Sequence, residues 1–559
     1  MQREDGKIIL PMTNSQSKSC KECSKSFEFF PEELEFYKKI NVPEPTLCPD
    51  CRQQRRLAFR NEKNLYKRAC DLCGAGMISF FDKDVNFPVY CSKCWWSDKW
   101  DPFSYGQDFD FSRPFFEQFK ELMHKVPKIG VLQLNNENCD YNALIAYSKN
   151  SYMSPGSYVI EDCYYLRKSQ YCKDCANSNF LDHCELVCAS VNCNNCYSCS
   201  NLIDCRNCSD CYYVAHASGC QNCFMCSDTV SKKFAFKNVP YPEAEYRKIL
   251  EKYKEKTTEE LSEEFKTFLS TLPKKYQNQI NCESSAGDYI QNCKNAQNCF
   301  DCFDVEDSKY LIESVDVKDS MDLSMHDKEI ELCYECCSGG EKNYDLKFAF
   351  CTCDAQNSSY LYACFYCMNC FGCDGFHSKN KNCILNKQYT EAEYKALLPK
   401  IIEHMRKTGE YGEFFPISLS LYGYNDSGAQ DFYTLTREEA LKKGYPWKEK
   451  DPAQYRPAPK LTEINPEKLA ETVTKEIFSC KYCGKNFQVL MQELKLFRRM
   501  KQSLSDICGN CRFIELSKLK NPRKLWERNC DKCGTALKSS YTTSRPEKIY
   551  CEKCYLETI

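Results

Sequence analysis

Residues 205–226 read Cys205-Arg-Asn-Cys-Ser-Asp-Cys-Tyr-Tyr-Val-Ala-His-Ala-Ser-Gly-Cys-Gln-Asn-Cys-Phe-Met-Cys226, with every cysteine separated from the next by three residues or a multiple of three. Asn or Asp comes directly before most of these cysteines. Both residue types tolerate the left-handed backbone conformation that a sharp corner needs. A corner followed by a short strand with one small inward side chain, repeated many times, predicts a parallel β-helix.

The same array extends well beyond this stretch and holds 29 of the 45 cysteines, between residues 139 and 383. In residues 139–226, fourteen of fifteen cysteines share one phase of the three-residue period, and only Cys188 departs from it. Asn or Asp precedes fifteen of the 29. Reduced cysteine behaves as a small hydrophobic residue, so the array is interpreted as the core of a right-handed β-helix or solenoid. The alternative is that neighbouring cysteines hold additional zinc.

The two ends of the chain are copies of each other at an offset of 460 residues. Each end has four Cys-x-x-Cys pairs, and other positions, such as Phe27 and Phe487, follow the same offset. The sixteen candidate metal ligands are Cys20, Cys23, Cys48, Cys51, Cys70, Cys73, Cys91, Cys94, Cys480, Cys483, Cys508, Cys511, Cys530, Cys533, Cys551 and Cys554.

Two Cys-x-x-Cys turns together supply the four thiolates of a tetrahedral zinc site. The eight pairs therefore predict four Cys₄ zinc sites per chain, with a structural role because sulfur fills every position. Sequential pairing, Cys20/Cys23 with Cys48/Cys51 and so on, is the simpler model, and a cross-braced pairing would use the same cysteines. The remaining alternative is that the pairs are buried free thiols.

A resemblance to a known family rests on Ser19-Cys-Lys-Glu-Cys-Ser-Lys-Ser-Phe27 and Leu47-Cys-Pro-Asp-Cys-Arg52. This stretch resembles a bacterial zinc-ribbon domain. The whole chain is similar to a cysteine-rich family from candidate-phyla bacteria that has such ribbons at both ends and a segment like Tyr389-Thr-Glu-Ala-Glu-Tyr394. The resemblance implies zinc at the ribbon cysteines and no particular activity. The C-terminal copy has Gly509 where the first has Pro49.

Helices are expected between and after the two solenoid parts, because Thr257, Thr390 and Thr436 each have Glu three residues later, the spacing of a capping box. The fold class is thus mainly β with α segments. The expected segments are a twin zinc-ribbon module at 1–99, a helical connector at 100–135, solenoid parts at 136–240 and 280–388, a helical insert at 241–279, a helical segment at 389–450, a linker at 451–477, and a duplicate twin module at 478–559.

Charge indicates a partner for the ends of the chain. The C-terminal copy, residues 480–554, has 17 Lys and Arg against 7 Asp and Glu, although the whole chain has a net charge of only −2. Basic side chains interleaved with aromatic ones suit phosphates and unpaired bases. The candidate nucleic-acid contacts are Arg52, Arg55, Arg56, Arg60, Lys518, Lys520, Arg523, Lys524 and Arg528. An ordinary solvated helix would show the same charges.

These patterns favour a non-catalytic zinc protein whose solenoid carries binding modules for RNA or single strands. A protein–protein scaffold and a metal or thiol store are the alternatives, and an enzyme on the solenoid face would have no identifiable residues. No phosphate-binding loop, dinucleotide fingerprint or nucleophile elbow is present, and no small-molecule substrate is indicated. Without an apolar leader or a membrane-length apolar run, we expect a cytoplasmic protein in a reducing compartment.

Overall fold

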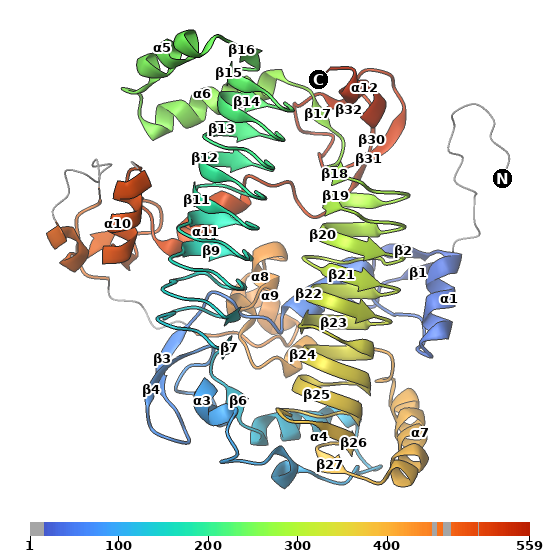
Figure 1. Ribbon diagram of the computed structural model, residues 1–559. Helices are drawn as coiled ribbons and strands as arrows, with labels where there is room; N and C mark the ends of the chain where they lie inside the picture. The colour runs from blue at the N-terminus through green and yellow to red at the C-terminus, as the bar shows by residue number, and fades with distance from the viewer. Residues whose placement is uncertain (1–15, 450–454, 462–470, 501, 559) are drawn as a thin grey trace. The chain divides into compact units, whose positions relative to one another are not determined.

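The computed structural model describes residues 16–449, 455–461, 471–500 and 502–558. Its contacts divide the chain into two compact units, each assembled from separate stretches of sequence. The first unit comprises the chain up to Asn61, Asp84–Lys128 and Gln279–Lys448. The second comprises Glu62–Lys83, Ile129–Asn278 and the chain from Glu449 onward. Each unit contains one solenoid and one end of the chain (Figure 1).

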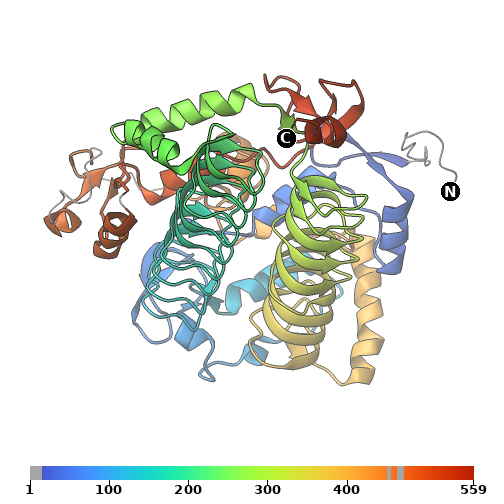
Figure 2. The same ribbon diagram turned by 45° about the horizontal axis from the view of Figure 1, so that its top comes forward.

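The solenoid of the second unit, called here the first solenoid, is built from coils of twelve residues. Ala176 pairs in parallel with Tyr164 on one side and with Cys188 on the other, twelve residues away in each direction. Figure 2 shows the coils stacked along one axis. The strands are β7 (Gln133–Leu134), β8 (Ile145–Ala146), β9 (Tyr164–Arg167), β10 (Ala176–Asn179), β11 (Glu185–Cys188), β12 (Tyr197–Ile203), β13 (Tyr212–Ala215), β14 (Gln221–Ser227), β15 (Lys233–Phe236) and β16 (Val239–Pro240).

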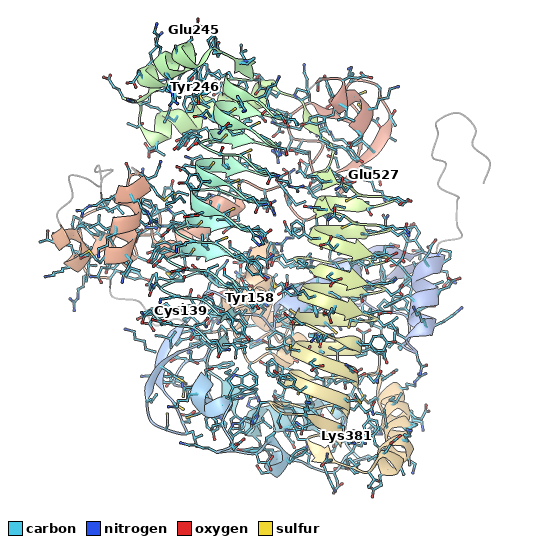
Figure 3. All side chains as sticks on the ribbon, viewed as in Figure 1. Cys139, Tyr158, Glu245, Tyr246, Lys381 and Glu527 are labelled. Carbon is cyan, nitrogen blue, oxygen red and sulfur yellow. The ribbon has the colours of Figure 1, made fainter. Side chains whose placement is uncertain are left out.

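Backbone conformation explains the three-residue period of the sequence. Nearly every third residue from Asn135 to Lys237 has a positive φ, so each coil turns four corners with three residues on each side. The residue after each corner points inward, and these residues form a core that begins at Cys139 (Figure 3). Cys188 precedes a corner and so points outward. The expected parallel solenoid with a cysteine core is therefore confirmed.

The second solenoid, in the first unit, has the same construction with irregular coils. Many of its paired residues are twelve apart, but Gln279 pairs with Ile290, eleven residues on, and pairs thirteen apart join β22 to β23, β23 to β24 and β25 to β26. Its strands are β18 (Gln279–Ile280), β19 (Ala286–Gln291), β20 (Gln297–Glu306), β21 (Val315–Lys318), β22 (Met321–Glu331), β23 (Tyr334–Gly339), β24 (Tyr344–Ser359), β25 (Tyr362–Phe371), β26 (Asn380–Ile384) and β27 (Lys387–Gln388).

Helix α4 precedes the first solenoid and further helices follow each solenoid, as the sequence predicts. Thr257, Thr390 and Thr436 form the expected capping boxes at the starts of three of them. Tyr246 of α5 is buried against the last coils of the first solenoid, while Glu245 beside it faces solvent (Figure 3). The helices are α4 (Phe115–Lys125), α5 (Glu243–Tyr253), α6 (Thr258–Thr271), α7 (Glu391–Thr408), α8 (Ala429–Phe432) and α9 (Arg437–Lys442). Of the linker expected at 451–477, residues 451–454 and 462–470 lie outside the described residues, and Glu471–Lys475 form a short 3₁₀ turn.

Each end of the chain forms two small modules. The N-terminal helical module (residues 16–60) has β1 (Gln16–Ser19), β2 (Ser26–Phe29), α1 (Pro31–Lys39) and α2 (Pro49–Leu57). The N-terminal hairpin module (66–95) has β3 (Tyr66–Ala69), β4 (Gly76–Ser79), β5 (Val89–Tyr90) and α3 (Ser92–Trp95). The C-terminal helical module (476–520) has β28 (Phe478–Ser479), β29 (Asn486–Phe487), α10 (Met491–Met500) and α11 (Gly509–Ser517). The C-terminal hairpin module (526–555) has β30 (Trp526–Asn529), β31 (Ala536–Ser539), β32 (Ile549–Tyr550) and α12 (Glu552–Leu556).

Candidate metal centres and the docked modules

The sixteen paired cysteines come together as four clusters, one in each module. In every cluster the four sulfur atoms lie within 4.8 Å of one another. The clusters are Cys20/Cys23/Cys48/Cys51, Cys70/Cys73/Cys91/Cys94, Cys480/Cys483/Cys508/Cys511 and Cys530/Cys533/Cys551/Cys554. Pairing is therefore sequential along the chain, and the cross-braced alternative is excluded.

The spacing of the sulfur atoms fits a zinc ion. Sγ of Cys23 lies 3.7 Å from Sγ of Cys48, and the equivalent pair Cys483 and Cys508 is 3.6 Å apart. Four sulfurs at about 2.3 Å from a tetrahedral zinc ion stand about 3.8 Å from one another. Each cluster therefore has the donor set and the size of a Cys₄ zinc site.

The second pair of every cluster begins a helix, which favours ionised thiols. Cys48, Cys91, Cys508 and Cys551 are the N-cap residues of α2, α3, α11 and α12. A thiolate at a helix N-terminus is stabilised by the helix dipole. Backbone amides add to this effect, because the N–H of Cys48 donates to Sγ of Cys20 at 3.2 Å and the N–H of Cys508 donates to Sγ of Cys480 at 3.3 Å.

Burial and backbone amides shift the pKa values of the clustered thiols in opposite directions, and burial prevails at the N-cap residues Cys508 and Cys551, whose pKa values are raised. Burial raises the pKa of Cys480, but the backbone N–H groups of Cys483 and Cys508 lower it by more than burial raises it, so the pKa falls to about 6. A thiol with that pKa is mostly ionised at neutral pH and is ready to bind a cation.

The first pair of each cluster ends in a tight turn with left-handed backbone. Gly74, Gly484 and Gly534 occupy this position with φ values of 74°, 71° and 76°. In the N-terminal helical module the equivalent residue is Ser24, which has a φ of 61°. A residue with a Cβ is less favourable in this conformation than glycine. The N-terminal helical module therefore carries backbone strain that its copy avoids.

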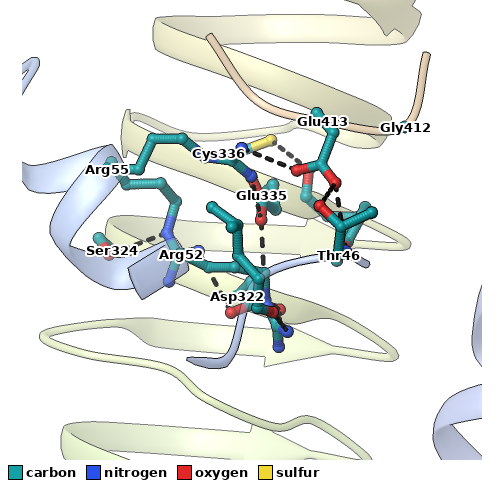
Figure 4. A network of polar contacts seen from close by, with 12 residues as sticks. Thr46, Arg52, Arg55, Asp322, Ser324, Glu335, Cys336, Gly412 and Glu413 are labelled. Atoms are coloured by element: carbon teal, nitrogen blue, oxygen red, sulfur yellow. Dashed lines mark hydrogen bonds and ion pairs between the residues drawn. The ribbon is translucent and has the colours of Figure 1, made fainter. Parts of the chain in front are cut away.

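The helix that follows Cys48 docks the N-terminal helical module on the second solenoid. Figure 4 shows its arginines directed at carboxylates of β22 and β23. Arg52 lies 2.8 Å from Asp322, and Arg56 lies 3.2 Å from the same residue. Arg55 donates to both oxygens of Glu335, at 2.9 and 2.7 Å. The helix is thus held by a buried network of opposite charges.

This network is closed on its outer side by the chain after α7. Glu413 accepts a hydrogen bond from Arg55 at 2.7 Å and another from the Thr46 hydroxyl at 2.6 Å. Burial raises the pKa of Glu413, but Arg55 and Thr46 lower it by more than burial raises it. The pKa of Glu413 is therefore below its usual value. Burial raises the pKa of Glu335, and the nearby guanidinium groups of Arg55 and Arg56 oppose that rise. Arg55 donates to both carboxylate oxygens of Glu335.

The C-terminal helical module docks on the first solenoid through the equivalent helix, α11. Arg512, the counterpart of Arg52, pairs with Glu493 at 2.7 Å and stacks 4.0 Å from the ring centre of Tyr165 on β9. The backbone of Gly509 lies so near the same ring that a Cβ at this position would stand 2.9 Å from Cε1 of Tyr165. The replacement of Pro49 by Gly509 is thereby explained. Cys188, the cysteine outside the three-residue phase, packs in this interface.

The candidate nucleic-acid contacts divide into two groups. Arg52, Arg55, Arg56 and Arg60 are at most 7% exposed and face carboxylates or hydroxyls of the second solenoid. The expectation that these four contact nucleic acid is corrected, because they are buried and bonded inside the protein. The remaining candidates are in the C-terminal modules, where Lys518 and Lys524 are exposed, Lys520 and Arg523 are half-buried, and Arg528 pairs with Asp531.

Sequence reasoning missed the carboxylates that receive these arginines. Asp322, Glu335 and Glu493 are all fully buried, and each lies on a regular element. The available signal was the shared offset, because Glu33 and Glu493 are equivalent, as are Arg52 and Arg512. This signal indicates the pair of Arg512 with Glu493 but not the partners of Arg52, because in the first copy Glu33 pairs with Lys309 and Arg52 pairs with Asp322.

The inward cysteines of the solenoids are packed as reduced thiols. Sγ of Cys208 donates to the carbonyl oxygen of Arg206 at 3.2 Å, and Sγ of Cys184 donates to that of Cys193, also at 3.2 Å. Burial raises the pKa of Cys193, which favours the neutral thiol. Within the described part of the chain, the four terminal clusters are the groups of three or more candidate metal ligands that all lie within 4.8 Å of one another.

Comparisons with known proteins identify one module. Residues 16–60 match the model of a family described as a "Probable treble clef domain". The position of Cys48 and Cys51 at the start of α2 agrees with that description, and it refines the ribbon expected from sequence. No curated protein matches the chain. Among solved structures, a "putative acetyltransferase from Desulfovibrio desulfuricans G20" is 9% identical over 47% of this chain and 69% of that chain. The TM-score of 0.10 is too low to indicate a shared fold.

None of the helices in the residues that the structure describes combines the length and the apolar character needed to cross a bilayer.

Proposed function

We propose that the protein is a non-catalytic zinc-binding scaffold, in which the metal clusters fold the modules that dock on the solenoids. The observation that carries this proposal is the link between cluster and interface. Cys48 and Cys51 belong to one metal cluster and also begin the helix whose arginines meet Asp322 and Glu335. Cys508 and Cys511 stand in the same relation to Arg512 and the first solenoid.

A structural role follows from the chemistry of the clusters. Four cysteine thiolates saturate a tetrahedral zinc ion, so no coordination position remains for a reacting water. When bound, the zinc ion would supply two positive charges that hold four thiolates together. The chain's own residues would orient the helix and bury its guanidinium groups.

The test is to remove the metal from the full-length protein with a chelator and to follow hydrogen exchange. We expect the amides of α2 and α11 to lose protection, while the solenoid strands keep theirs, because structural zinc contributes directly to folding of small modules. Elemental analysis should give about four zinc ions per chain. Unchanged protection of both helices after complete metal removal would refute the proposal.

Nucleic-acid binding is a second candidate function, and it is now restricted to the C-terminal modules. Lys518 and Lys524 are exposed, and Lys524 lies 5.8 Å from the ring centre of Trp526. An exposed cation beside an aromatic ring suits a phosphate and an unpaired base. This arrangement supports the proposal, and the buried arginines of the N-terminal module play no part in it.

This second candidate is tested by the salt dependence of binding to single-stranded RNA and DNA. We expect the Lys518→Gln/Lys524→Gln variant to weaken binding and to reduce the slope of log affinity against log salt by about 1 to 2. The control is Lys252→Gln/Lys254→Gln, which removes the same charge from α5 and its C-cap, outside the modules. If both variants bind as the wild type does, this candidate is refuted.

A further inference from the structure

The two helical modules differ in whether another part of the chain covers the outer side of the docking helix. In the N-terminal module, the outer side of α2 is covered by residues 411–448 of the chain itself. Leu57, Ala58 and Phe59, at the end of this helix, are completely buried. In the C-terminal module the equivalent residues are Ser517, Lys518 and Leu519, and all three are exposed.

Three kinds of contact hold the covering segment on the N-terminal module. Phe59 packs against Phe414 and Phe415, with ring centres 5.4 and 5.8 Å apart. The side-chain amide of Gln54 donates to the hydroxyl of Tyr424 at 2.7 Å. Two charged pairs complete the set, Arg55 with Glu413 at 2.7 Å and Glu22 with Lys443 at 2.7 Å.

The same positions in the C-terminal module form a more apolar surface. Glu22 is replaced by Tyr482, Gln54 by Ile514 and Phe59 by Leu519. These side chains are 59%, 50% and 38% exposed. We call Tyr482, Ile514 and Leu519 the outer face of the C-terminal helical module. Large apolar side chains that gather on one exposed face mark an interaction site.

No segment of the described chain takes the place of residues 411–448 on this face. After the first solenoid the chain forms α5 and α6 and reaches β17 (Lys274–Lys275), which pairs with β32. Helix α6 reaches the module through one exposed ion pair, Glu259 with Lys481 at 2.8 Å. Among the residues that the structure describes, none therefore covers Tyr482, Ile514 and Leu519 as residues 411–448 cover α2, and these three side chains are exposed.

Charge then indicates what kind of occupant fits. Both charged contacts of the N-terminal module are lost here, because Tyr482 replaces Glu22 and Glu515 replaces Arg55. Glu515 is already paired with Lys518 at 2.6 Å. A segment with an acidic residue at the position of Glu413 would meet Glu515 instead of an arginine, so the chain's own segment 411–448 is a poor match.

We infer that the outer face of the C-terminal helical module docks a partner protein through a neutral segment that carries neighbouring aromatic residues. This inference rests on the proposed scaffold function, because the zinc cluster of the module must hold α11 in place. The partner segment would lie on α11 as residues 412–424 lie on α2, with its aromatic rings against Leu519 and an apolar or aromatic side chain against Ile514.

The test uses a fluorescent peptide with the sequence of residues 411–446 and the full-length protein. Two peptides are compared by anisotropy, one with the natural sequence and one with the substitution Glu413→Gln. We expect the substituted peptide to bind about tenfold more tightly, because removing one uncompensated charge at a desolvated contact changes affinity by about that factor. Ile514→Asp/Leu519→Asp in the protein should abolish this binding, whereas Val230→Asp, at an apolar residue of the first solenoid that is 63% exposed, should leave it unchanged.

Other results would overturn the inference. These are failure of the Glu413→Gln peptide to bind, or equal binding to the Ile514→Asp/Leu519→Asp protein. Single-stranded RNA that binds the wild type and is lost in this variant would assign the face to nucleic acid instead. Tyr482→Glu provides a second variant on an exposed turn. Zinc content is measured for every protein. A wild-type protein that retains four zinc ions but does not bind the Glu413→Gln peptide refutes only this inference, while metal-free protein with intact modules refutes the scaffold function.

Discussion

Replacing Glu335 by glutamine should release the N-terminal helical module from the second solenoid. Glu335 is fully buried and accepts two hydrogen bonds from Arg55, at 2.9 and 2.7 Å. Its loss leaves the guanidinium group of Arg55 with Glu413 as its remaining charged partner. Breaking a buried ion pair from one side costs about 3 to 5 kcal/mol. Because each 1.4 kcal/mol is a factor of ten, the open population of the module should rise by a factor of roughly 10² to 4 × 10³.

Hydrogen exchange of the backbone amides measures this opening directly. Peptides that cover residues 49–60 should exchange faster by that factor in the Glu335→Gln protein. Peptides that cover residues 509–520 provide an internal standard, because α11 docks through Arg512 and Tyr165 and contains no contact with Glu335. The control substitution is Glu331→Gln, an exposed residue at the end of the neighbouring strand, β22. Equal exchange of α2 in wild type and variant, or acceleration of both helices together, would show that this ion pair does not hold the module.

Three further predictions concern packing and backbone geometry. Cys208 is 1% exposed in the core of the first solenoid. Cys208→Ala should lower the thermal midpoint of unfolding slightly, and Cys208→Leu should lower it more, because overpacking costs about 1 to 3 kcal/mol. A midpoint raised by leucine would show that the core has spare volume. Gly509→Ala places a Cβ 2.9 Å from Tyr165 and should accelerate exchange in α11 but not in α2; an unchanged rate would show that the ring moves aside. Ser24→Gly should slow exchange in residues 20–25 by relieving up to about 1 kcal/mol of left-handed strain, with Gly484→Ser as the reciprocal change; the opposite signs would contradict the strain at Ser24.

Much of the architecture is predictable because it repeats. The three-residue period, with Asn or Asp before cysteine, gives both the corners and the inward positions of the first solenoid. The offset of 460 residues gives the duplicated modules and all sixteen cysteines of the clusters. Local capping boxes give the starts of α6, α7 and α9. Each of these signals depends on residues that are close in sequence or in register.

Docking of the modules is not predictable in the same way. The arginines of α2 look like a nucleic-acid surface because a sequence shows charge and not burial. Their partners, Asp322 and Glu335, lie 270 and 280 positions away and belong to a solenoid whose neighbours along the chain are helices. Only the fold reveals that these charges are internal. The sequence shows that Cys188 departs from the three-residue phase. The cause is its contact with the C-terminal helical module, which is distant from Cys188 in the sequence.

The long separation within this ion-pair network has a consequence for synthesis of the protein. All four cysteines of the N-terminal helical module lie before Arg52, so its metal cluster can assemble as soon as this part leaves the ribosome. Asp322 follows its partner Arg52 by 270 residues, and Glu413 follows its partner Arg55 by 358 residues. At about 5 to 20 residues per second, the finished helix waits roughly 15 to 70 s for its carboxylates. The C-terminal helical module follows its solenoid along the chain, so its docking surface already exists when it emerges. Of the two helical modules, the first is therefore the one whose basic helix is exposed for a time to the ribosome's own RNA.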